Sequence, residues 1–179
     1  MKTWSKTILS VYKYLEALSN SIDELVLKKS INSAFYNNGR FNSSCYDCAN
    51  KIMQLTERKV NLINIKVLVD DTLSKMPLKY RQLLALSYID NAKSEDIAEI
   101  MHISIRTFFR KKNEALNSFA KNLILQGYSK EKLENMFCGE HWLKNLYDKN
   151  HRLEDSDFKI EDYNKYRFFK SVLREFNVV

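Results

Sequence analysis

The sequence predicts an all-α fold, in which long N-terminal helices precede a compact three-helix unit and a helical C-terminal segment. The chain has 179 residues with only 3 Gly and 1 Pro, too few for the turns of a many-stranded sheet or for the glycine-rich loops that hold nucleotide phosphates. Apolar residues instead recur every three or four positions, which is the period of an amphipathic helix. These patterns divide the chain into segments 1–75, 76–127 and 128–179.

The first segment opens with a heptad stripe, whose members alternate spacings of four and three. They are Trp4, Ile8, Val11, Leu15, Leu18, Ile22 and Leu25. Two interpretations remain open: a coiled coil that pairs two copies as a homodimer, or a bundle helix packed on its own chain.

A second long helix is predicted from residue 45 to residue 76. Residues 30–44, rich in Ser and Asn, predict the loop before it. Lys59 and Lys66 interrupt its apolar face, and a kink near residues 57–61 would accommodate them. Pro77 separates this helix from the next, because proline suits the first turn of a helix and breaks its interior.

Three shorter helices are predicted in the middle segment. The first spans about residues 78–89, and Asp90-Asn91 end it with turn-forming residues. Ser94 is a suitable N-cap for the second helix and Ser104 for the third. The third helix continues to about residue 125, where Gly127 stops it.

The last two of these helices have the pattern of a helix-turn-helix, whose second helix enters the DNA major groove. Basic residues fill its opening turns: Arg106, Arg110, Lys111 and Lys112. Arg106 and Arg110 are four apart and share a face with Thr107 beside them, while Phe108 falls among the inward positions with Ile105. The alternative is a solvated basic helix in an ordinary three-helix bundle.

Residues 76–116 resemble the region-four helix-turn-helix domain of the sigma-70 family. The matching positions are Pro77, Tyr80, Arg81, Leu84, Asp96, Ile97, Ala98, Glu99, Ile100, Ile103, Ser104 and Thr107. The resemblance implies that the third helix reads duplex DNA and that the domain docks on RNA polymerase. By position, the implied readers are Ile105, Arg106, Thr107, Phe109 and Arg110. Lys111 and Lys121 complete the predicted DNA-binding set, with Lys121 placed for phosphate.

The sequence departs from the family pattern in three places. His102 stands where the turn often has glycine, and His is among the residues that tolerate a left-handed backbone. Phe109 occupies a position that is usually polar, which suits thymine methyls or another protein. Residues 1–75 lack the aromatic, polymerase-clamping region two of a complete sigma factor.

These departures make the chain similar to small phage or mobile-element transcription regulators of low-GC bacteria. The predicted function is therefore sequence-specific DNA binding with the helix that starts at Ser104. The alternative is a protein-interaction module that binds RNA polymerase or a sigma factor without reading DNA itself.

The cysteines suggest a metal site. Cys45 and Cys48 form one pair with metal-ligand spacing, and Cys138 and His141 form another. Together they make a Cys₃His set suited to structural zinc, which would join the C-terminal segment to the start of the second long helix. The alternative is that the thiols are small buried residues with no metal. No other cofactor is expected.

The C-terminal segment predicts helices near residues 129–137, 140–150 and 160–176. Residues 128–179 carry 10 Lys and Arg against 10 Asp and Glu, so the whole surplus of +7 lies earlier in the chain. A basic surplus suits a polyanionic partner. We therefore interpret the C-terminal segment as a partner-binding or oligomerisation module and not as a nucleic-acid surface.

Several function classes are excluded by what the sequence lacks. No apolar run approaches the roughly 20 residues that cross a bilayer, and the N-terminus shows no apolar stretch typical of a secretory signal. No carboxylate pair, Ser-His-Asp order or nucleotide loop stands out. We therefore expect a cytoplasmic protein that has no catalytic activity and no contact with a membrane.

Overall fold

The computed structural model describes residues 1–36, 45–152 and 162–176, and the regular elements in these ranges are all helical. In chain order they are α1 (Lys2–Val11), a 3-10 turn (Tyr12–Tyr14), α2 (Leu15–Tyr36), α3 (Cys45–Ser74), α4 (Leu78–Leu84), a π-helical turn (Ala85–Ile89), α5 (Ser94–Ile100), α6 (Ile105–Leu125), α7 (Lys130–Met136), α8 (His141–Arg152) and α9 (Asp162–Phe176). The predicted all-α class is confirmed. None of the described helices is long and apolar enough to cross a lipid bilayer.

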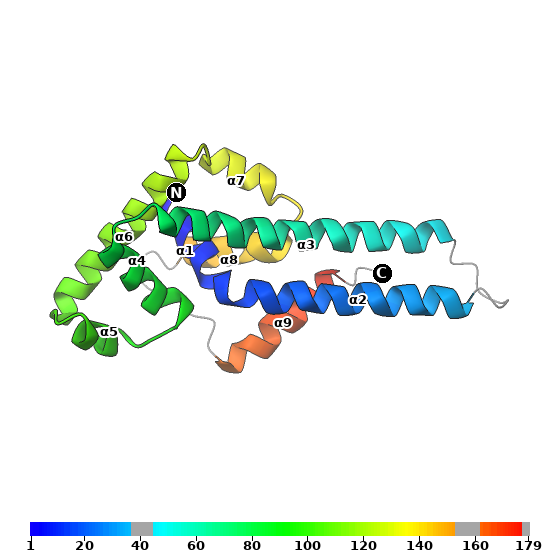
Figure 1. Cartoon of the computed structure of the whole chain (residues 1–179), viewed down its shortest axis with the longest axis horizontal. Helices are drawn as coiled ribbons and strands as arrows, with labels where there is room; N and C mark the ends of the chain where they lie inside the picture. The colour runs from blue at the N-terminus through cyan, green and yellow to red at the C-terminus, as the bar shows by residue number, and fades with distance from the viewer. Residues whose placement is uncertain (37–44, 153–161, 177–179) are drawn as a thin grey trace.

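The long helices α2 and α3 form an antiparallel hairpin, and α4, α5 and α6 gather at one end of it (Figure 1). Lys59 Nζ pairs with Asp23 at 2.7 Å and Lys66 Nζ with Glu16 at 3.0 Å, in both cases from α3 to α2. The two lysines therefore lie at the edge of the interface and reach acids on the facing helix. Because α3 does not have to bury them, it runs without interruption, and the predicted kink near 57–61 is wrong.

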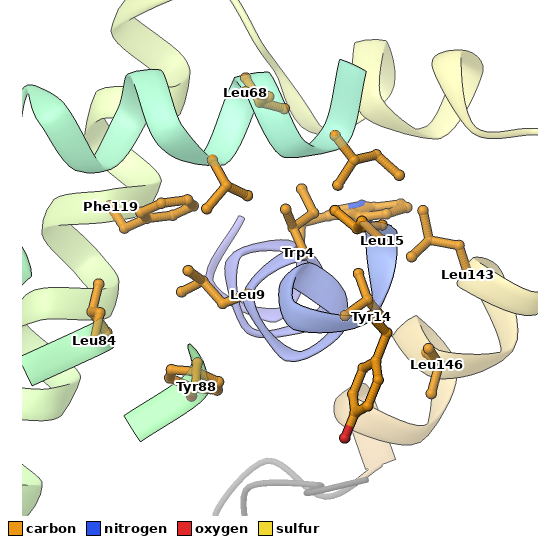
Figure 2. Packing of buried hydrophobic residues seen from close by; sticks show 14 of the residues in the cluster. Trp4, Leu9, Tyr14, Leu15, Leu68, Leu84, Tyr88, Phe119, Leu143 and Leu146 are labelled. Carbon is orange, nitrogen blue, oxygen red and sulfur yellow. The ribbon is translucent and has the colours of Figure 1, made fainter. Parts of the chain in front are cut away.

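α1 lies at the centre of the molecule. Every residue from Trp4 to Val11 is buried, and α3, α6, α8 and the π-helical turn surround the helix (Figure 2). Its hydroxyl groups donate to backbone carbonyls of the preceding turn: Ser5 to Met1 at 3.2 Å, Thr7 to Thr3 at 2.9 Å, and Ser10 to Thr7 at 2.8 Å. Asn150 Nδ2 on α8 also donates to Thr7 Oγ1 at 3.1 Å. Polar groups that are satisfied in this way allow a helix to be buried on all sides.

The N-terminal heptad stripe lies in this central core. Its first six members, from Trp4 to Ile22, are buried, and Leu25 is partly buried against them. The structure therefore agrees with the bundle interpretation, because a stripe already covered by its own chain cannot also pair two copies. The predicted homodimer contact through this stripe is corrected accordingly.

Two boundaries in the N-terminal segment also differ from the prediction. The 3-10 turn at Tyr12–Tyr14 divides the expected single helix into α1 and α2. The helix α2 continues to Tyr36, so residues 30–36 are helical and not part of the predicted loop. The remaining part of that loop, residues 37–44, lies outside the described residues.

The C-terminal helices form where the sequence predicts them, and they pack on the same core. The Trp4 ring lies 4.7 Å from that of Tyr147 on α8, and the Tyr14 ring lies 5.8 Å from that of Phe168 on α9 (ring centroids). The buried carboxylate of Glu140 accepts from Trp142 Nε1 at 2.7 Å and from Asn61 Nδ2 on α3 at 3.3 Å. Tyr147 and Phe168 of the C-terminal segment, which was interpreted as a partner-binding module, thus pack within the chain.

Candidate nucleic-acid interface

The core of the three-helix unit holds α6 against α4 and α5. Leu83 and Leu84 on α4, Ile97 and Ala98 on α5, and Phe108 on α6 are all buried, and Phe108 is inward as the sequence predicts. The opposite face of α6 is left to solvent. This arrangement fixes which side chains of α6 a ligand can reach.

The turn between α5 and α6 has the left-handed residue that the sequence predicts. His102 has φ 51°, and the N–H of Ile103 donates to the Ala98 carbonyl at 2.9 Å across the turn. This six-to-one hydrogen bond ends α5 in the manner of a Schellman motif. The imidazole side chain is exposed, so the backbone conformation and not a buried contact accounts for the residue at this position.

Ser104 caps α6. Its Oγ accepts from the Thr107 N–H at 3.2 Å, and its hydroxyl also shares a 2.9 Å hydrogen bond with the Thr107 hydroxyl. The predicted cap is therefore confirmed. The cap predicted at Ser94 is wrong: Lys93 occupies the N-cap of α5, no side chain caps that helix, and the acidic Glu95 and Asp96 complement its N-terminus instead.

The predicted DNA-binding side chains lie largely on the solvent side of α6. Arg106, Arg110 and Lys121 are exposed, as are Ile105 and Phe109. Thr107 and Lys111 are half-buried. The structure thus brings together the arginines, Phe109 and Ile105 within the first turns of one helix.

Two residues of this unit are placed differently from the prediction. Ile105, grouped with Phe108 among the inward positions and also among the implied DNA readers, is exposed, because it stands at the first position of α6. Lys112, predicted to belong to the basic surface, is buried. Its Nζ lies 4.9 Å from the centroid of the Tyr88 ring. Lys112 therefore contributes to packing between α6 and the π-helical turn and not to the outer face.

Asn113 and Asn117 lie on the same face of α6 and were not among the predicted residues. Both are exposed, and they follow Arg106 and Arg110 at intervals of seven, which places them on the same face of α6. The seven-residue spacing was the signal that could have identified them. An asparagine side chain can bond the edge of adenine in two places.

A surface network links α4 to the outer face of α6. The Tyr80 hydroxyl donates to Glu114 Oε2 at 3.2 Å, and Glu114 Oε1 lies 3.9 Å from Arg110 Nε. The hydrogen bond to Glu114 raises the pKa of Tyr80 above its usual value. Glu114 thereby restricts where the guanidinium of Arg110 can lie.

The structure does not bring Cys48 together with Cys138 and His141. Cys48 lies near the start of α3, and its thiol donates a hydrogen bond to the Lys29 carbonyl, with 3.7 Å between Sγ and the oxygen. The Cys138–His141 segment is anchored elsewhere on α3, because Glu140 contacts Asn61. Asn61 is 13 positions after Cys48, or about 20 Å along the helix.

The side chain of Cys45 lies outside the described residues. Among those that the structure does describe, no group of three or more His, Cys, Asp or Glu side chains could hold a metal ion. Cys138 is exposed and Cys48 half-buried.

Comparison with known proteins identifies one similarity. Residues 66–116 match the family model described as sigma-70, region 4. The match includes α4, α5 and the capped start of α6, and it begins within α3, before residue 76. No curated protein and no solved structure shows significant similarity to the chain.

Proposed function

We propose, from this match to sigma-70 region 4, that the chain is a cytoplasmic transcription regulator that binds a specific sequence of duplex DNA. The observation that carries the proposal is the exposed Arg106–Arg110 face of α6, held in place by the Ser104 cap. α5 and the first turns of α6 lie at the outer end of the molecule, away from α7, α8 and α9 (Figure 1). A DNA duplex can therefore approach this face without displacing another helix.

The side chains on this face have complementary roles. The guanidinium groups of Arg106 and Arg110 match the paired acceptors of guanine in the major groove, and Phe109 offers an apolar contact to thymine methyls. Lys121 follows Arg106 by 15 positions, about 22 Å along α6, which is farther than the roughly 12 Å width of the groove. Lys121 is therefore assigned to a backbone phosphate, and Lys111 borders the groove.

The test is to select duplexes from a random library with purified protein and to measure their binding by fluorescence anisotropy. Arg106→Ala and Arg110→Ala should each cost about 1–3 kcal/mol of specific binding and relax the preference at one base pair. Lys28→Ala, which removes an exposed charge from the far part of α2, is the matched control. The proposal would be overturned if the protein bound no duplex at low salt, or if the double arginine variant bound DNA with the same affinity as the wild type.

A second candidate function is supported by exposed apolar residues on the same unit. Leu78 on α4 and Ile100 on α5 are each more than half exposed, which suits a module that contacts RNA polymerase or a sigma factor without reading DNA. Leu78→Asp and Ile100→Asp should then abolish capture of purified RNA polymerase, while the arginine variants retain it. If the arginine variants alone lose function in transcription assays, the DNA-reading proposal is favoured.

A further inference from the structure

The outer face of α3 carries an apolar stripe that is exposed to solvent. Its members are Met53, Val60, Ile63 and Val67, with Tyr46 one heptad before Met53. The exposed fractions of these side chains lie between 44% and 71%. On the other side of the helix, Leu55, Leu62 and Val69 are buried in the core. α3 therefore has two apolar faces, and the fold of the single chain covers one of them.

The α3 stripe follows a heptad spacing. Met53, Val60 and Val67 lie at intervals of seven and occupy a positions of one heptad register, and Ile63, three positions after Val60, occupies a d position. The other d positions of this register hold Thr56 and Asp70, so the a positions would make most of the apolar contact between copies. α3 has 30 residues, a length of about 45 Å, which is long enough for three heptads of contact.

The two flanks of the stripe carry opposite charge. Glu57 and Asp71 occupy e positions on one flank, whereas Lys59 and Lys66 occupy g positions on the other. In a parallel pair, each g position meets the e position five residues later on the other helix, which sets Lys66 against Asp71 and Lys59 against Asn64 of the second copy. In an antiparallel pair, like flanks meet, so acids face acids and lysines face lysines.

We propose that a second copy of this chain covers the α3 stripe, and that the two α3 helices form a parallel coiled coil. The stripe and its charged flanks complement themselves in this orientation, so no other protein is needed to account for them. Lys66 pairs with Glu16, and Asp71 with Lys75 at 2.7 Å, within the chain. Exposed pairs of this kind contribute little to stability, so they can exchange for contacts between copies.

The end of the stripe is open as well. A hollow beside Val67 is lined by Asn64 and Asp71 on α3 and by Gln126, Tyr128 and Met136 from the α6–α7 region. Val67 therefore borders a hollow whose other wall is formed by the α6–α7 region. Dimerisation through α3 also leaves the α6 face free, since the two surfaces belong to different elements.

The first experiment measures mass by light scattering and analytical ultracentrifugation. The wild type should be a dimer at tens of micromolar. Met53→Lys/Val60→Lys should raise the dimer dissociation constant by on the order of a hundredfold, because each copy loses two apolar contacts and gains two buried charges. Leu27→Lys, on the exposed side of α2, is the control and should remain dimeric. Circular dichroism checks that each variant is folded.

The second experiment tests the orientation. Cys45, Cys48 and Cys138 are replaced by Ser, and Met53→Cys and Val67→Cys are then made singly. In a parallel pair, a short bismaleimide links each of these variants to itself. In an antiparallel pair, the two positions are about 21 Å apart along the helix, so at most one of them can link.

Each result decides the proposal. A wild type that is monomeric at these concentrations, or a lysine double variant as dimeric as the wild type, overturns the α3 contact. Self-linking at only one position, or at neither, overturns the parallel arrangement. DNA binding is assessed separately. A monomeric lysine variant that still binds a short duplex leaves the DNA-reading function intact, while Arg106→Ala/Arg110→Ala should lose DNA and remain dimeric.

Discussion

The hydroxyl of Tyr80 on α4 donates to the carboxylate of Glu114 on α6, and the same carboxylate faces Arg110. We expect Glu114→Ala to free the guanidinium of Arg110 and to remove a negative charge from the proposed DNA-binding face. Affinity for non-specific duplex should rise several-fold at low salt, and the ratio of specific to non-specific affinity should fall. The free energy of unfolding should change by less than about 1 kcal/mol, because the pair is exposed. Anisotropy titrations with selected and scrambled duplexes measure the ratio, and an unchanged ratio would contradict the role given to Glu114.

Phe109 is 51% exposed on α6, and we expect Phe109→Ala to alter recognition without altering the fold. If its ring contacts a thymine methyl, replacing that thymine with deoxyuridine should weaken wild-type binding about fourfold, the equivalent of roughly 0.8 kcal/mol for one buried methyl group. Phe109→Ala should be insensitive to the same replacement. If no thymine-to-deoxyuridine change altered the affinity of the wild type, this contact would be excluded.

Trp4 is the largest side chain on the central helix, and its ring packs against those of Tyr147 and Phe137. We expect Trp4→Ala to lower the free energy of unfolding by about 3–5 kcal/mol, since the substitution leaves a cavity in the core. Urea unfolding followed by circular dichroism measures the loss. Phe109→Ala is the matched aromatic control and should cost far less, because it removes a ring from the surface.

Tyr12 should make stability depend on alkaline pH. Its partial burial, together with its 2.6 Å hydrogen bond to Asp70, raises the pKa of Tyr12 to about 12, above the ordinary value of 10.0. A raised pKa means that the contribution is fully present below pH 10 and is lost as the pH rises towards 12. Thermal melts of the wild type and Tyr12→Phe should therefore differ below pH 10 and converge above it; parallel curves across this range would contradict the assignment.

The thiols should differ in reactivity. Cys138 is exposed and Cys48 is half-buried with its Sγ directed at a carbonyl. Brief alkylation followed by peptide mass spectrometry should label Cys138 faster than Cys48, and a chelator should leave both rates unchanged. If both thiols were protected from alkylation and a chelator removed that protection, the result would support the predicted zinc set. It would also contradict the separation seen in the structure.

Local signals in the sequence predicted much of the helix-turn-helix unit. Ser104 is a cap because its hydroxyl can reach an N–H three residues on, and His102 marks a left-handed turn; both effects act within a few residues. Gly127, with φ 81°, stops α6 for a similarly local reason. The α6 face could therefore be predicted without knowledge of the rest of the chain.

The remaining differences come from contacts between distant segments. Ser5, Thr7 and Ser10 make α1 look amphipathic, yet neighbouring helices cover them once their hydroxyls are satisfied within the helix. Lys112 reads as part of a basic surface, but its position on α6 turns it towards Tyr88. Periodicity gives the faces of a helix and not which neighbours will cover each face. For the same reason, the heptad pattern at the N-terminus could not show that its own stripe is buried while the stripe on the outer face of α3 remains exposed.

The central position of α1 has a consequence for how the chain folds. Thr7 and its hydrogen-bond partner Asn150 are separated by 143 positions, so α1 can meet this part of α8 only after the whole intervening chain has been synthesised. Contacts between such distant segments carry a high entropic cost of loop closure and slow the folding of a helical protein. Until α8 arrives, the apolar side of α1 towards it is uncovered, which exposes the nascent chain to aggregation. Synthesis that stalls before α8 is complete should therefore leave products that chaperones or proteases remove, even though α6 is already complete.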